Sequence, residues 1–131
     1  MGVSRIVPIF RVTDMRAAIE FYCSTLGFAM DFSYSASPEG PTYAAVSIGG
    51  HQLHLSTFAG DGAAGTTAYC YVDDVDALFE RFLAGGFRTP GNPNSPVEEG
   101  PVNQSWGMRE VYVRDPDGNT LRFASPVQQA G

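Results

Sequence analysis

Apolar residues recur along this chain with two periods, and the order of those periods is found twice. In two stretches they return every three or four residues, at Met15, Ala18, Ile19, Tyr22 and Leu26, and again at Val75, Leu78, Phe79 and Phe82. Apolar side chains at these intervals line one face of an α-helix. The pattern therefore predicts one amphipathic helix in each half of the chain.

Capping residues stand at both ends of the two predicted helices. The N-cap candidates are Thr13 or Asp14 for the first helix and Asp73 or Asp74 for the second. Their side-chain oxygens can accept hydrogen bonds from the free N–H groups of the first helical turn. Gly27 and the pair Gly85-Gly86 follow the helices, where a left-handed backbone conformation often ends a helix.

The remaining apolar positions follow the shorter β-strand period. The predicted strands are residues 5–12, 28–34, 42–48 and 51–57 in the first half, and residues 67–72, 87–89, 109–114 and 120–124 in the second. The pair Gly49-Gly50 is typical of a tight hairpin between two of these strands. Residues 115–119, Asp-Pro-Asp-Gly-Asn, predict a turn before the last strand.

The two halves look like copies of one module. Displacing the sequence by 60 residues aligns residues 12–20 with residues 72–80, and Val, Asp, Ala and Glu coincide. Each half reads βαβββ, so the predicted fold class is α+β, with two modules, about 1–60 and 64–131, in a single domain of 131 residues. The irregular, proline-rich residues 90–101 must lie over the surface or over a cleft.

Composition places the chain among ordinary globular domains. Hydrophobic residues make up 44% of it and charged residues 17%, which excludes intrinsic disorder. No apolar run approaches the roughly 20 residues that cross a bilayer, and no signal-peptide core is found. Cys23 and Cys70 are predicted to be free buried thiols, which agrees with a reducing, cytoplasmic location.

The chain is acidic, with a net charge of -6. Residues 61–131 hold ten of the fourteen acids and five of the eight arginines, so most of the negative charge lies in the second half. Such a charge repels nucleic acid phosphates, and a charged partner is expected to be cationic. Ordinary solubility is the alternative explanation for the same acids.

Three local sequence marks accompany the double module. They are Val12-Thr-Asp-Met15, Phe21-Tyr22 followed by Leu26-Gly27-Phe28, and the turn at residues 115–119. Together with the two βαβββ modules, they resemble the vicinal oxygen chelate superfamily, which includes glyoxalase I, extradiol dioxygenases, fosfomycin-resistance enzymes and bleomycin-resistance proteins. The resemblance covers nearly the whole chain and implies two curved mixed sheets around a shared cleft.

The enzymes of this superfamily hold a divalent metal through four His or Glu side chains. The resemblance puts these positions at Pro8, His54, Thr67 and Arg122. Only His54 is a usual ligand, because Pro has no donor atom and Arg keeps a charge that opposes a cation. His51 faces the other side of its strand. We therefore expect no metal and no cofactor, with a metal-dependent enzyme of the glyoxalase, dioxygenase or thiol transferase type as the alternative.

One branch of the superfamily, the bleomycin-resistance proteins, lacks the metal and is similar to this chain in three stretches. These are residues 7–9 with 18–22 and 26–32, residues 66–72, and residues 104–119, which contain Trp106-Gly107 before a strand. The resemblance implies a non-enzymatic protein that sequesters a cationic aromatic drug of the bleomycin type in an aromatic, acidic cleft. A binding protein for another drug, such as a mitomycin, is a second alternative.

The candidate ligand-binding residues come from this resemblance and from side-chain type. They are Phe32, Tyr43, His54, Tyr69, Glu98, Trp106 and Gly107. Aromatic rings can stack on a flat drug, Glu98 in the proline-rich loop can attract a cationic tail, and His54 is expected to be a neutral lining residue. Core packing is the alternative for the strand aromatics, and a solvated loop for Glu98. Arg122 is expected to pair with a loop acid or with Glu110.

The resemblance also implies a homodimer that exchanges an N-terminal arm and lines each cleft with both chains. Pro8 suits the point where the arm leaves its own sheet, because proline removes a hydrogen-bond donor from the strand ladder. The expected partners are therefore a small-molecule antibiotic, free or as its metal complex, and a second copy of the chain. We expect neither nucleic acid nor a membrane as a partner.

Overall fold

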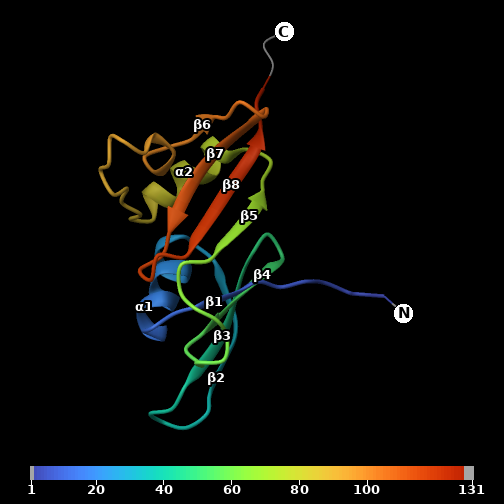
Figure 1. The fold of residues 1–131 in the computed structure, drawn as a ribbon, viewed down its shortest axis with the longest axis vertical. Coiled ribbons are helices and arrows are strands. Elements are labelled where there is room, and N and C mark those ends of the chain that lie inside the picture. Colours follow the sequence, from blue (N-terminus) through green and yellow to red (C-terminus); the bar gives the residue numbers. More distant parts are fainter. Residues whose placement is uncertain (1, 129–131) are drawn as a thin grey trace. The chain divides into compact units, whose positions relative to one another are not determined.

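The computed structural model describes residues 2–128 of the chain. The chain divides into two compact units. The first contains the described residues up to Thr66 together with the turn Asp115–Asn119, and the second contains Thr67–Arg114 and the described residues from Thr120. Each unit holds one four-stranded mixed sheet and one main helix (Figure 1). The predicted α+β class with two βαβββ modules is confirmed.

The first sheet has the strand order β1-β4-β3-β2. Its strands are β1 (Ile9–Arg11), β2 (Ala29–Ser35), β3 (Thr42–Ile48) and β4 (His51–Ser56). β1 runs parallel to β4, whereas β3 runs antiparallel to both of its neighbours. Gly49 and Gly50, with φ of 57° and 80°, form the tight turn between β3 and β4 that the glycine pair predicts.

The first strand is shorter than predicted. Of residues 5–12, only Ile9–Arg11 pairs with β4 along its length. Phe10 is buried as the alternation requires, but Ile6 is 90% exposed and does not continue the buried face. Pro8 has no N–H to give to the strand ladder, so regular pairing begins after it.

The first helix is also different from the prediction, because it is α-helical for only five residues. α1 (Met15–Ile19) continues directly into a π-helix, η1 (Glu20–Thr25). Ala18, Tyr22 and Leu26 are all buried, and they lie four residues apart. This spacing exceeds the roughly 3.6 residues of an α-helical turn, and the wider π turn brings the three side chains onto one face.

Both helices begin and end at predicted caps. Asp14 and Asp74 each accept a hydrogen bond of 3.1 Å from the N–H three residues further on. Gly27 and Gly86, with φ of 84° and 103°, take the left-handed conformation that ends each helix.

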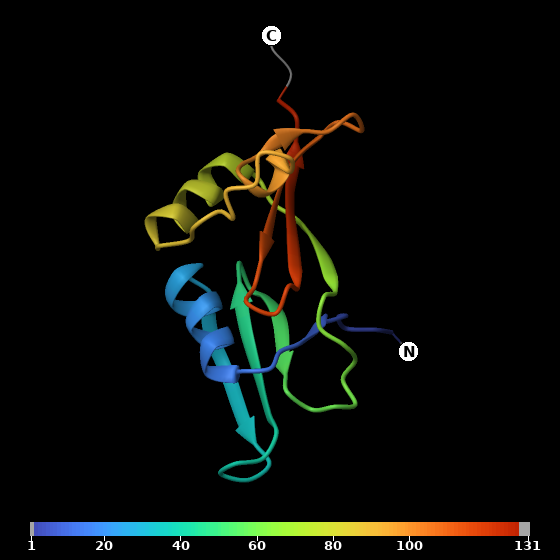
Figure 2. The same cartoon turned by 60° about the vertical axis from the view of Figure 1, so that its left-hand side comes forward.

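The core of the first unit lies between its helix and one face of its sheet (Figure 2). Alternate positions on β3 and β4 supply Ala44, Val46, Leu53 and Leu55, each 4% exposed or less. The period of two therefore leaves the intervening residues of these strands on the other face of the sheet.

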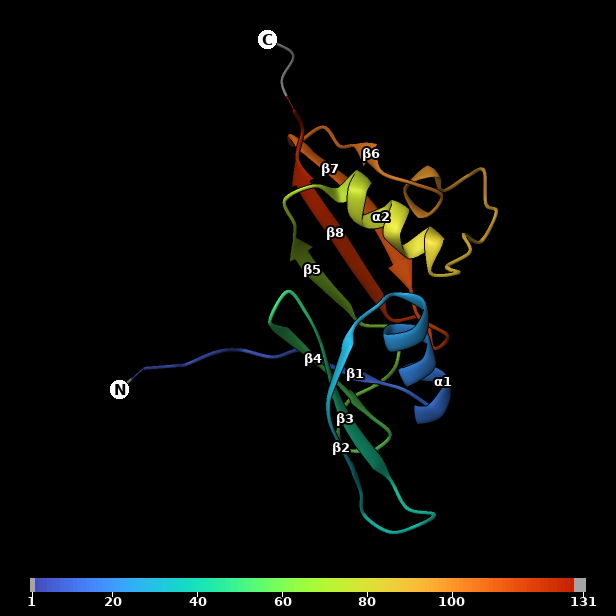
Figure 3. The same cartoon turned by 180° about the vertical axis from the view of Figure 1, so that it is seen from behind.

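The second sheet repeats the first as β5-β8-β7-β6. Its strands are β5 (Thr67–Tyr71), β6 (Val102–Asn103), β7 (Met108–Arg114) and β8 (Thr120–Pro126). The helix α2 (Val75–Ala84) lies across one face of this sheet (Figure 3) and buries Val75, Phe79 and Phe82. β5 runs parallel to β8, as β1 does to β4.

The short strand predicted at residues 87–89 is wrong. Phe87 N donates to Phe82 O at 3.0 Å at the end of α2, and the Phe87 ring meets Phe79 edge-on at 6.2 Å between centroids. Phe87 is thus the apolar contact that accompanies a glycine helix end. The strand that completes the four-stranded sheet is instead β6, which follows the proline-rich stretch and the 3₁₀ turn η2 (Pro96–Glu98).

The two cysteines are free, as predicted, but they are half-buried rather than fully buried. Burial raises the pKa of the Cys70 thiol to about 11, so this thiol stays protonated at neutral pH. Across residues 2–128, no helix is both long enough and apolar enough to cross a membrane.

The turn Asp115–Asn119 is fixed by hydrogen bonds to other parts of the first unit. Asn119 is fully buried, and its Oδ1 accepts hydrogen bonds from Gly65 N at 2.8 Å and from Thr66 N at 3.1 Å. Its Nδ2 donates to Arg11 O at 2.9 Å. The sequence predicts the turn, but not that one side chain of it satisfies three distant backbone groups.

We expect Asn119→Ala to lower the free energy of unfolding by about 2 to 4 kcal/mol, because two N–H groups and a carbonyl lose their partners. Urea unfolding followed by circular dichroism measures the change. Asp117→Ala is the matched control, since its carboxylate bonds only exposed groups of Thr13, and its loss should stay below about 1 kcal/mol. Equal losses in the two variants would contradict this role for Asn119.

Candidate functional site

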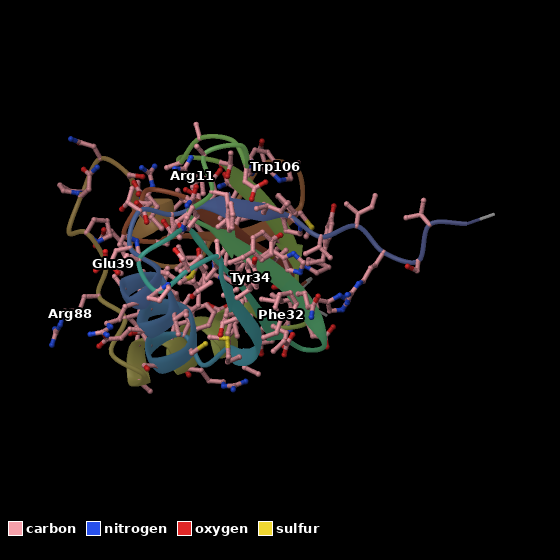
Figure 4. All side chains as sticks on the ribbon, turned by 90° about the horizontal axis from the view of Figure 1, so that it is seen from below. Arg11, Phe32, Tyr34, Glu39, Arg88 and Trp106 are labelled. Carbon is pink, nitrogen blue, oxygen red and sulfur yellow. The ribbon has the colours of Figure 1, made fainter. Side chains whose placement is uncertain are left out.

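Each sheet has one face covered by its helix, and we call the other face the open face. On the first sheet, the open face carries Asp31, Phe32, Tyr43, Gln52 and His54. A β-bulge between Met30 and Phe32 interrupts the alternation of β2 and turns Asp31 and Phe32 to the same side. Phe32 and Tyr34 project from this strand (Figure 4).

Three rings form a cluster on the open face of the first sheet. The rings of Phe32 and Tyr43 are nearly parallel, with 8° between their planes and 6.4 Å between their centroids. His54 meets both rings edge-on, at 5.7 Å from Phe32 and 5.3 Å from Tyr43. Because Phe32 is 46% exposed, the cluster presents an aromatic surface and does not fill the core.

A chain of hydrogen bonds fixes the imidazole of His54. Gln52 Nε2 donates to Asp31 Oδ2 at 3.0 Å, which leaves Gln52 Oε1 facing His54 Nε2 at 3.2 Å. An amide oxygen only accepts, so Nε2 carries the hydrogen and Nδ1 accepts from Tyr43 Oη at 2.7 Å. Burial and the charge of Arg5 lower the pKa of His54, although Asp31 opposes them. The ring is therefore neutral at pH 7.

Glu110 is the centre of the open face of the second sheet. Its side chain is fully buried, and Oε1 accepts a hydrogen bond from Arg122 Nη2 at 2.8 Å. Oε2 accepts from the Trp106 indole Nε1 at 2.9 Å and from the Tyr69 hydroxyl. Burial raises the pKa of Glu110, but the hydrogen bonds of these donors and the charge of Arg122 outweigh it and hold the pKa below its usual value. Glu110 therefore stays ionised at neutral pH.

Arg122 lies between tyrosines from the two neighbouring strands. Its guanidinium carbon is 5.0 Å from the ring centroid of Tyr69 on β5 and 4.8 Å from that of Tyr112 on β7. The strand register pairs both tyrosines with Arg122, so all three share the open face. The charge of the guanidinium is thus balanced by one carboxylate and two aromatic rings.

Trp106, labelled in Figure 4, stands in the turn before β7. The residue is 57% exposed. Its N–H edge is held by Glu110 at 2.9 Å. Gly107 follows with φ of 87°, a left-handed conformation that residues with side chains rarely adopt. The turn therefore holds the indole at one edge and leaves much of its surface available to a flat ligand.

Glu98 belongs neither to the ring cluster on the first sheet nor to the group of side chains around Glu110 on the second. It is 9% exposed, so it is not a solvated loop residue, and its Oε1 lies 2.7 Å from Arg114 Nε in an ion pair. Its neighbour Glu99 accepts hydrogen bonds from the N–H groups of Gly91 and Asn92 at 2.9 and 3.1 Å. Both acids of the proline-rich loop thus already have partners within the second unit.

Five of the seven predicted site residues divide between the two open faces. Phe32, Tyr43 and His54 come together on the first, and Tyr69 and Trp106 come together on the second. Glu110 and Arg122 pair with each other, which is one of the partnerships that the sequence left open. The open faces also carry three residues that the sequence does not predict as part of a site, Asp31, Gln52 and Tyr112. The turn at residues 115–119 fixes the β7–β8 register and could have placed Tyr112 beside Arg122, whereas no sequence signal marks the bulge at Asp31.

A pocket of about 400 Å³ lies around the N-terminus of α2, away from the open face of the second sheet. Its lining includes Asp74, Asp76 and Arg109. Asp74 caps the helix, and Asp76 forms two hydrogen bonds of 2.8 and 3.0 Å with Arg109. Because these charges stabilise the fold through their own partners, the pocket is a weaker candidate site than the open faces.

The positions implied as metal ligands do not fit a divalent metal. Within residues 2–128, no group of three or more His, Cys, Asp or Glu side chains could hold a metal ion. Both ring nitrogens of His54 are engaged by Tyr43 and Gln52, and Arg122 is a cation paired with Glu110. A guanidinium at such a position repels a metal ion and offers it no lone pair.

We expect His54 to titrate below pH 6.5, the ordinary pKa of histidine, because burial disfavours its charged form. The His51→Gln variant leaves one histidine in the chain, so its ring protons can be followed alone by NMR. Since the folded pKa is lowered, the stability that it contributes is complete above about pH 6.5 and decreases as the pH falls below that value. His54→Gln should abolish this decrease. A midpoint at or above 6.5 would contradict the hydrogen-bond chain.

Comparison with known proteins agrees with this architecture. A family model described as "Glyoxalase superfamily protein" matches residues 1–130. The bleomycin-binding protein of bleomycin-producing Streptomyces verticillus, in complex with copper(II)-bleomycin, is 30% identical, with a TM-score of 0.67 over 94% of this chain and 96% of that one. TnmS3, an antibiotic binding protein from Streptomyces sp. CB03234, is 26% identical, with a TM-score of 0.69 over 96% and 98%.

A third structure, a bleomycin resistance determinant encoded on the transposon Tn5, matches in fold at 20% identity, with a TM-score of 0.73 over 96% of this chain and 100% of that one. The family match therefore spans nearly the whole sequence, and the structural matches span both modules. The chain belongs to the glyoxalase superfamily, within which it matches the bleomycin-resistance branch.

Proposed function

We propose that the protein is a non-enzymatic antibiotic-binding protein that protects by capturing a cationic aromatic drug of the bleomycin type. The observation that carries this proposal is Trp106, a residue that is 57% exposed while the N–H edge of its indole is fixed by a buried carboxylate. A rigid aromatic surface of this kind binds flat heteroaromatic rings at little entropic cost. The same ligand class is supported by two similar proteins, the bleomycin-binding protein of Streptomyces verticillus and the antibiotic binding protein TnmS3.

The cluster on the first sheet supplies complementary chemistry for such a drug. Phe32 and Tyr43 present aromatic surface, and Asp31 is exposed beside them with no salt bridge among the described residues. Its oxygens accept hydrogen bonds from Ser47 at 2.9 Å and Gln52 at 3.0 Å, which hold the carboxylate in place. We propose Asp31, rather than the ion-paired Glu98, as the acid that attracts a cationic tail.

The contacts of Glu110 argue for capture of a ligand rather than for catalysis. The most buried carboxylate, Glu110, accepts three side-chain hydrogen bonds, and its pKa is held low. A general acid or base needs a pKa near the working pH and a free lone pair or proton. Glu110 does not meet the pKa requirement, because the donors around it hold its pKa low and its charge orients those donors.

We expect bleomycin to bind the wild-type protein with a Kd below about 10 μM, roughly -7 kcal/mol, in calorimetric titrations with and without bound copper. Trp106→Ala should weaken binding by about 1 to 3 kcal/mol, because the stacking surface is lost. Trp106→Phe keeps a ring and should lose less. Leu83→Ala, at an exposed position of α2, is the matched control and should bind as the wild type does. Wild-type binding weaker than this limit would sink the proposal.

The proposal includes a homodimer with an exchanged N-terminal arm, acting in the reducing cytoplasm that two free thiols suit. Val3 and Ile6 in this arm are 81% and 90% exposed, which a single chain leaves without apolar contacts. Pro8, also exposed, lies just before β1 and is the proposed hinge.

We expect the full chain to sediment as a dimer and a chain without residues 2–7 to sediment as a monomer, because the exchanged apolar contacts are removed. Analytical ultracentrifugation measures both. Replacing Ser4 with Ala, which alters the arm without removing an apolar side chain, is the control and should leave the dimer intact. A monomeric full chain would refute the exchange.

A further inference from the structure

We propose that Arg122 is a ligand-binding residue, whose guanidinium edge donates hydrogen bonds to an oxygen acceptor on a planar group such as a carboxylate, amide carbonyl or quinone. The inference rests on the proposed capture of an aromatic drug and defines which part of that drug the second sheet binds. It assigns the cationic tail to another place, because a guanidinium has only hydrogen-bond donors and offers a cation no acceptor.

Arg122 leaves several of its hydrogen-bond donors unused. A guanidinium has several N–H groups in one plane. One hydrogen bond is made, from Nη2 to Glu110 at 2.8 Å. Within residues 2–128, Nη1 has no hydrogen-bond partner and Nε is buried without one. The side chain is 27% exposed, so a ligand can reach the outer edge of this plane.

Aromatic rings also flank the guanidinium on two sides. Tyr69 and Tyr112 contact it from the strands on either side, with centroid distances of 5.0 and 4.8 Å. These rings occupy the space where a ligand ring could otherwise stack on Arg122. A ligand therefore meets N–H groups, and their natural partner is an oxygen that accepts in the plane.

The guanidinium is held in one orientation before any ligand arrives. Glu110 fixes one end of it, and the same carboxylate holds the Trp106 indole at 2.9 Å and the Tyr69 hydroxyl. A preorganised donor loses little entropy on binding. Because Trp106 and Arg122 share Glu110 as a partner, a flat ligand on the indole can place an acceptor near the guanidinium edge.

Two flat probes of opposite charge test the inference in calorimetric titrations. They are naphthalene-2-carboxylate, which carries the acceptor, and 2-naphthylmethylammonium, which carries a cation. We expect the carboxylate to bind the wild-type protein at least about tenfold more tightly than the ammonium, since charge-assisted hydrogen bonds are the strong ones. Equal affinities, tighter binding of the ammonium, or no binding of the carboxylate would overturn the proposal.

Substitutions of Arg122 distinguish the loss of its hydrogen-bond donors from a loss of folding. Arg122→Lys keeps the charge beside Glu110 but loses the planar donor edge, and it should bind the carboxylate about tenfold more weakly. The double variant Arg122→Met with Glu110→Gln removes both charges together, so that no unpaired buried charge remains, and it should lose the preference between the probes. Arg109→Lys, in the ion pair with Asp76, is the matched control and should keep it. Unchanged carboxylate affinity in both Arg122 variants would overturn the proposal.

Bleomycin titrated in parallel keeps the two proposals distinct. If the wild type binds bleomycin and the Arg122 variants bind it equally well, the Arg122 inference fails while the drug-capture proposal stands. If only naphthalene-2-carboxylate binds, and does so through Arg122, the drug-capture proposal fails and the acceptor site stands.

Discussion

The charge on Glu110 determines how the other side chains on the open face of the second sheet are arranged. An ionised carboxylate removed from water costs several kcal/mol unless donors surround it. Arg122, Trp106 and Tyr69 supply those donors, and they come from β8, the turn before β7, and β5. The requirement to satisfy one buried charge thus orients an indole, a phenol and a guanidinium, which are the groups that we propose contact a ligand.

Much of the fold could be predicted because each helix and most strands have a local cause. The N-caps Asp14 and Asp74, and the glycines with positive φ after the helices, act within one turn, so their positions follow from spacing alone. The predictions that failed are those in which the tertiary contacts of a residue outweigh its local preference. Phe87 is a residue type that favours β-strands, yet it packs at the end of α2 because its ring contacts Phe79 there.

The sequence predicts which types of residue form the candidate site, but it predicts few of the contacts between them. Tyr69 and Trp106 were expected as ligand contacts, but their shared partner Glu110 follows only from strand register. Asp31 reaches the open face of the first sheet through a β-bulge that no pattern of residues indicates. Charge alone makes Glu98 a candidate, but its carboxylate is already paired with Arg114, because the sequence shows acids and not their partners.

The central claim is that the open faces of the sheets, and not the pocket beside α2, bind the drug. Amide and indole NMR shifts during a titration with bleomycin test it most directly, because Trp106 is the only tryptophan and gives one indole N–H signal. The account predicts large shifts for Trp106, for its neighbours on β5, β7 and β8, and for Phe32 and Tyr43. Shifts confined to Asp73, Asp74 and Asp76, with the indole signal unmoved, would contradict it.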